Sequence, residues 1–143
     1  MTKGTDLTAA LVEALEGIVP SAGFHTQLFG IYEDARKVPK DARKPYALVR
    51  LNLDRIDSMA GPSAKRIREY EIEVVFAGTA ERRDLELCHH DLLRSFGLGK
   101  AQPQRAFPGW RNEEEAAYLP PGVDGSTTWR LVSAVSLNYS ENY

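Results

Sequence analysis

One stretch in the middle of the chain constrains the fold most, because it contains a complete strand followed by a complete helix. Across residues 70–76, apolar side chains alternate with glutamates, as in a strand with one buried face and one face in water. Across residues 85–96, apolar side chains recur every three or four positions, as on the buried side of a helix. We expect Thr79 to cap this helix and Gly97 or Gly99 to end it. The helix then packs against the sheet that contains the strand.

The rest of the chain supplies one more helix and four more strands. Apolar spacing predicts a helix from Thr5 or Asp6 to about Ile18, and strands at residues 24–29, 46–56, 112–119 and 127–139. The proline-containing segments 100–110 and 120–125 are predicted to be an irregular crossover and a turn. The order αβββαββ indicates a single α+β domain over residues 1–143, with a mixed, largely antiparallel sheet of about five strands packed against two helices.

The second and third strands are predicted to form a hairpin. Gly61 and Pro62 lie between them and favour a turn. A turn centred there places Arg50 opposite Glu73, where the two side chains would form a cross-strand ion pair. Alternation predicts one face of the second strand as Ala47, Val49, Leu51 and Leu53.

Composition excludes several classes of protein. The 143 residues are 43% hydrophobic, which suits one domain of ordinary size, and the formal net charge of −2 is typical of neither a nucleic-acid-binding protein nor an acidic disordered chain. The single cysteine, Cys88, cannot form an internal disulfide, and the N-terminus does not resemble a signal peptide, so we expect a reducing compartment. The apolar runs are too short to cross a bilayer.

Charge is distributed unevenly along the chain. Residues 36–68 contain ten basic and three acidic residues, and glutamates dominate afterwards. The densest basic run, which we call the basic loop, spans residues 36–44. Its basic residues are Arg36, Lys37, Lys40, Arg43 and Lys44. This loop could contact an acidic patch of another subunit, lie free in solvent, or face nucleic acid. We favour the subunit contact, because no aromatic side chains alternate with the charges to stack bases.

The residues that most resemble catalytic or metal-binding groups fit structural roles better. His89 and His90 diverge by about 100° on a helix and cannot share one metal ion unaided, and His25 lies on a different element. We therefore predict solvent-facing or capping histidines. Cys88 falls on the buried stripe and is predicted to be a core residue.

Two further patterns are also interpreted as structural. Residues 97–100 read GLGK, but they follow a helix and lack the spacing of a phosphate-binding loop. The acidic triplet at residues 113–115 is predicted to be a solvated or interface edge, with no histidine partner nearby. The sequence thus predicts no catalytic, cofactor-binding or metal-binding residue.

Several segments together resemble a known family. An N-terminal amphipathic helix, two strands joined by a long loop, the segment EYEIEVVFAGTA with its following helix, and a final WRLVSAVSLNYSENY strand resemble the tail terminator proteins of long-tailed bacteriophages and prophages. These are also called minor tail protein U or tail-to-head joining proteins. The resemblance implies a non-enzymatic α+β protein of the virion, assembled in the bacterial cytoplasm, with no cofactor.

The resemblance also implies partners. Members of this family close into a hexameric ring on the tail tube, stop its polymerisation and present a surface to the head-neck connector. It places the loop at residues 33–44 among the segments that order at ring or tube contacts. Neither specific nucleic-acid binding nor a membrane partner is expected. A ring joins two different patches of neighbouring subunits, and the basic loop with the later glutamates, including Glu71 and Glu73, offers such a pair.

Other functions are compatible with the same sequence. A second candidate is another tail or neck component, such as a tube or head-completion protein. A third, from a different class, is a small cytoplasmic enzyme or a nucleic-acid-binding module.

Overall fold

The computed structural model describes residues 2–101, 107–122 and 125–143. The helices are α1 (Lys3–Glu16) and α2 (Arg82–Ser95), with short 3-10 turns η1 (Pro20–Ala22) and η2 (Ala35–Lys37). The strands are β1 (Ile31–Tyr32), β2 (Tyr46–Ala60), β3 (Ser63–Phe76), β4 (Trp110–Leu119) and β5 (Trp129–Asn142). They form one sheet in the order β1-β2-β3-β5-β4. Only the β1–β2 pair is parallel, so the predicted α+β class with a mixed, largely antiparallel sheet is confirmed.

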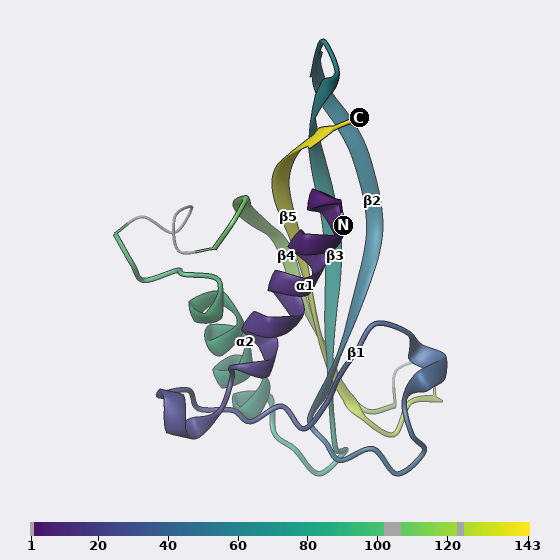
Figure 1. Cartoon of the computed structure of the whole chain (residues 1–143). Helices are drawn as coiled ribbons and strands as arrows, with labels where there is room; N and C mark the ends of the chain where they lie inside the picture. The colour runs from purple at the N-terminus through teal and green to yellow at the C-terminus, as the bar shows by residue number, and fades with distance from the viewer. Residues whose placement is uncertain (1, 102–106, 123–124) are drawn as a thin grey trace.

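Both helices pack on the same side of the twisted sheet (Figure 1). The core lies between them and the even-numbered side chains of β3, as the alternation over residues 70–76 predicted. The buried residues of the two helices are those of the predicted stripes. They are Leu7, Leu11 and Leu15 in α1 and Leu85, Cys88 and Leu92 in α2, with Ile18 and Phe96 just beyond. Gly4 and Asp91 are also buried, and the apolar spacing did not predict them. We call the opposite side of the sheet its outer face.

The helix termini differ from the predictions by a few residues. The Thr2 side chain caps α1 by accepting a hydrogen bond from the backbone N–H of Thr5, so the helix begins earlier than expected. The prediction of Thr79 as the cap of α2 is wrong. The N-cap residue is Glu81, and Asp84 Oδ2 accepts a hydrogen bond from its backbone N–H at 2.9 Å, as in a capping box. Gly97, with φ of 93°, follows the end of α2 as predicted.

The predicted strand at residues 24–29 is wrong, and the first strand is β1, a few residues later. The backbone N–H groups of His25 and Thr26 donate to the Asp91 carboxylate, so they are not available to a strand ladder. Pairing with the start of β2 begins only at Phe29, whose N–H donates to the Pro45 carbonyl at 2.9 Å.

The β2–β3 hairpin forms as predicted, but its register is shifted. At the turn, Ala60 pairs with Ser63, as a turn at Gly61 and Pro62 requires. Two β-bulges then add one extra residue each to β2, so Arg50 lies opposite Glu71 instead of Glu73. In this sequence the bulges do not interrupt the alternation of apolar and polar residues. The alternation therefore predicted a pairing register without a shift.

The last two strands lie close to their predicted positions. β4 begins at Trp110, slightly before the predicted start, and β5 lies between β3 and β4, as expected for a strand with two apolar faces. The crossover at residues 100–110 and the turn at 120–125 were also predicted. Residues 102–106 and 123–124 of these segments lie outside the described residues. Neither helix of the described chain has the length and apolar character needed to cross a membrane.

Candidate assembly surface

The far half of the β2–β3 hairpin extends past the helices. α1 begins at the level of Arg68, whose Nη1 donates to the Gly4 carbonyl at 2.8 Å, and of Glu141, which accepts from the N–H groups of Lys3 and Gly4. Beyond this level no helix of the described residues covers either face of the hairpin (Figure 1), while β5 stays paired with β3 as far as Ser63. Residues 55–60 of β2 lie beyond this level, because Asp54 pairs with Arg68, and all six are exposed. Residues 51–53 lie on the α1 side of it and are exposed as well.

Large apolar side chains gather on this uncovered half. Leu51, Leu53, Ile56 and Met59 are 47%, 45%, 49% and 70% exposed, and we call these four residues the hairpin patch. Cross-strand partners share a face of a sheet. Leu51, Ile56 and Met59 pair with the even-numbered Tyr70, Arg66 and Ala64 of β3, so they lie on the helix side of the sheet, where no helix reaches Ile56 and Met59. Leu53 pairs with Glu69 and lies on the outer face.

The same half of β2 is also an open sheet edge. β1 pairs with β2 only at Ala47 and Leu48, so from Val49 onward no strand of the described residues covers the other edge of β2. An exposed edge strand that carries apolar side chains is a template for association with another chain.

A network of charged and hydroxyl groups holds the hairpin at the point where it leaves the core. The Asp54 carboxylate accepts from Arg66 Nε at 2.6 Å, from Arg68 Nε at 2.5 Å and from the Tyr139 hydroxyl at 2.5 Å. Partial burial alone would raise the pKa of Asp54, but the hydrogen bonds from Tyr139, Arg66 and Arg68 outweigh it and lower that pKa below its usual 3.8. The network joins β2, β3 and β5, so it fixes the direction of the hairpin.

The basic loop lies at the other end of β2, immediately before the strand begins. Its five basic residues are all exposed. Arg36 forms a salt bridge at 3.0 Å with Asp34, which lowers the pKa of that carboxyl, and the Arg43 guanidinium lies 3.9 Å above the centre of the Phe29 ring. Lys37, Lys40 and Lys44 are in contact with solvent, so the loop offers positive charge to a partner. Whether a partner uses it stays a prediction.

The two glutamates of the predicted interface lie on the outer face and engage arginines of their own chain. Glu71 accepts from Arg50 Nη1 at 3.2 Å, and Glu73 accepts from Arg50 Nη2 at 3.3 Å. Glu73 lies 3.7 Å from Arg130 and is only 7% exposed. The predicted Arg50–Glu73 pair is therefore present despite the shifted register, because the guanidinium reaches both carboxylates.

The histidines and the acidic triplet come together in ways that the sequence did not indicate. The prediction that the triplet lacks a histidine partner is wrong, since Glu113 Oε2 lies 2.8 Å from His89 Nε2. His89 Nδ1 lies 2.7 Å from the Tyr118 hydroxyl, and Ser133 donates to Glu113. The Glu113 carboxylate lies between Ser133 and His89, so the His89 imidazole does not contact the serine hydroxyl. This order does not let His89 take a proton from Ser133.

Cys88 and His90 have contrasting surroundings. Cys88 is fully buried, and this burial raises the pKa of its thiol to about 12, so it occupies the predicted core position in a protonated form. His90 is exposed and lies beside His25 and Asp91. That cluster joins two elements far apart in sequence, which is why sequence spacing missed it.

The hairpin patch was missed for a different reason. Alternation assigned Leu51 and Leu53 to the same face as Ala47 and Val49, but the bulge after Leu51 moves Leu53 to the outer face. The strand lengths explain the exposure: β2, with 15 residues, is about 50 Å long, more than twice the length of the 14-residue helix α1, which is about 21 Å. Comparison with known proteins adds no assignment, because no family model and no curated protein matches the chain.

Proposed function

We propose that this protein is a non-enzymatic structural subunit of a phage tail, a tail terminator, that assembles with copies of itself into a ring on the end of the tail tube. In this role it ends polymerisation of the tube and offers a surface to the head-neck connector. The protein is then a component of the virion, assembled in the host cytoplasm, and the proposed ring is a hexamer.

The observation that carries the proposal is the hairpin patch. Four large apolar side chains are exposed along the open edge of β2, three on the helix side and Leu53 on the outer face. Their exposure destabilises a monomer, since each side chain would be more stable out of water. A second copy of this chain is the partner we favour. Charged residues of both signs, among them Asp57 and Lys65, are exposed along the same half of the hairpin, and charged residues are common at the edges of interfaces between protein subunits.

The positions of the two candidate surfaces favour a ring over an isolated dimer. The basic loop and the hairpin turn lie at opposite ends of β2, a strand of 15 residues that spans about 50 Å. Contacts made by different surfaces of neighbouring subunits are head-to-tail, and they close into a ring when the rotation between subunits allows it. The basic loop would meet exposed glutamates such as Glu114 and Glu115 on a neighbour or on the tube.

The test is electron microscopy of the purified protein mixed with tail tubes of the phage or prophage that encodes it. We expect a ring at tube ends and tubes that stop growing. Tubes that continue to grow, with bare ends, would contradict the proposal. Long tubes formed by the protein alone would assign it to the second candidate, a tube component.

A double substitution links this result to the hairpin patch. Ile56→Asp with Met59→Asp adds two negative charges to the patch, and we expect loss of ring formation at tube ends. Arg83→Glu is the matched control, because it changes the net charge by the same amount at an exposed position on α2. Capping by the double variant at the level of the control would exclude the hairpin patch as the contact.

A further inference from the structure

The Asp91 carboxylate fastens the segment after η1 to helix α2. Asp91 is completely buried, and its Oδ2 accepts from the backbone N–H of His25 at 2.9 Å and of Thr26 at 2.7 Å. Arg94, one turn further along α2, donates to the Gly23 carbonyl at 3.0 Å. These bonds hold the segment in one position against the helix.

The second oxygen of the same carboxylate has no such partner. Among the described residues, no donor lies within hydrogen-bonding distance of Asp91 Oδ1, and no basic side chain forms a salt bridge with Asp91. A buried carboxylate oxygen without a donor destabilises the folded protein, because it has lost its hydrogen bonds to water and has formed none with the protein. A bound cation would supply the missing interaction.

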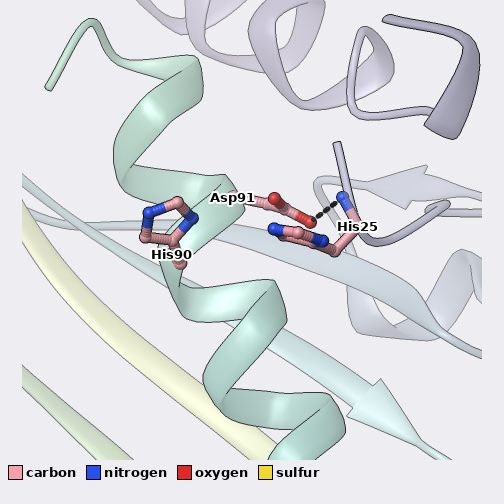
Figure 2. Close-up of side chains that lie close together, drawn as sticks. All are labelled: His25, His90 and Asp91. Atoms are coloured by element: carbon pink, nitrogen blue, oxygen red, sulfur yellow. Dashed lines mark hydrogen bonds between the residues drawn. The ribbon is translucent and has the colours of Figure 1, made fainter. Parts of the chain in front are cut away.

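Two imidazoles lie beside this carboxylate. His25 comes from the segment after η1, and His90 precedes Asp91 on α2 (Figure 2). One ligand atom from each of the three residues lies within 4.8 Å of the others. We propose that His25, His90 and Asp91 bind a divalent transition-metal ion, with Zn²⁺ as the ion that best fits these donors.

The donor set selects the kind of metal. Two imidazole nitrogens and one carboxylate oxygen suit Zn²⁺ and its first-row neighbours, whereas Mg²⁺ and Ca²⁺ prefer oxygen donors throughout. Around tetrahedral Zn²⁺, with bonds near 2.0 Å, ligand atoms lie about 3.3 Å apart. The distances between the three ligand atoms must therefore shorten by about 1.5 Å at most for the ion to bind. His25 and His90 are both exposed, so rotation of their side chains can supply this movement, while Asp91 stays fixed.

The expected role of the ion is to join the segment after η1 to α2. Three protein ligands leave the fourth position of a tetrahedral ion facing solvent, next to the two exposed histidines. This inference does not depend on the proposed assembly function, since the cluster joins α2 to the segment after η1 and lies outside the hairpin patch.

The test is calorimetric titration of Zn²⁺ into tag-free, chelator-treated protein at neutral pH. We expect one Zn²⁺ per chain and a melting temperature that rises with zinc concentration. His25→Ala and His90→Ala should each weaken binding at least about tenfold, since even loss of a supporting residue costs that much at metal sites. Asp91→Asn should also weaken it, although its amide oxygen can still accept from the two N–H groups.

His89→Ala is the matched control. His89 is adjacent to His90 but is directed toward Glu113 on β4, so this variant should bind Zn²⁺ as the unaltered protein does. Two results would overturn the inference. One is the absence of binding heat and of any melting shift with excess Zn²⁺. The other is equal affinity in the His25→Ala and His90→Ala variants and the control.

Discussion

The two halves of the β2–β3 hairpin have similar sequence patterns and opposite surroundings. At the core end, residues 70–76 of β3 lie under the helices and are mostly buried, whereas residues 55–60 of β2 lie beyond the start of α1 and are all exposed. Both halves contain large apolar side chains. Burial here is decided by which part of the sheet a helix reaches, and a strand longer than its covering helix leaves the remainder exposed.

Two leucines, one in the core and one on the exposed part of the hairpin, allow the effect of burial on stability to be measured. Leu92 is fully buried on the inner side of α2, in the core, and Leu53 is 45% exposed on the hairpin. We expect Leu92→Ala to cost about 2 to 5 kcal/mol of unfolding free energy, because it leaves a cavity. Leu53→Ala should cost less than about 1 kcal/mol. Urea denaturation of the isolated chain measures both, and similar losses would show that the hairpin is covered in the monomer.

The Asp54 network marks the border between the two halves and should give the next largest effect. Asp54→Asn removes the charge that Arg66 and Arg68 surround, and we expect a loss of about 1 to 3 kcal/mol at neutral pH. The folded pKa of Asp54 is lowered, so its contribution is present above the unfolded pKa and is lost as pH falls through the folded value.

The pH dependence provides the internal control for this variant. The difference in stability between the unaltered protein and Asp54→Asn should be constant near neutral pH and should shrink below about pH 4. Denaturation curves at several pH values measure it. A difference that does not change in acid would mean that the carboxylate charge contributes nothing to the network.

Much of the core end could be predicted from sequence, and little of the exposed end. The spacing of Leu85, Cys88 and Leu92 is fixed by the helical period, so these apolar residues were found, while the buried Asp91 beside them was not. The bulges of β2 and the contact of His25 with Asp91 depend on tertiary packing. Such contacts cannot be predicted from local sequence patterns. The register shift, the hairpin patch and the histidine cluster could therefore be found only in the structure.

The basic loop should show the smallest effect on folding. Exchange of Arg36, Lys37 and Lys40 for glutamate removes one exposed salt bridge, so we expect the melting temperature to change by no more than about 2 °C. Ring formation on tail tubes should nevertheless be lost, because the reversed charges would repel the acidic surface of a neighbour. Rings of unchanged size and tails of unchanged length would show that the loop is only solvated, leaving the hairpin patch as the contact to map.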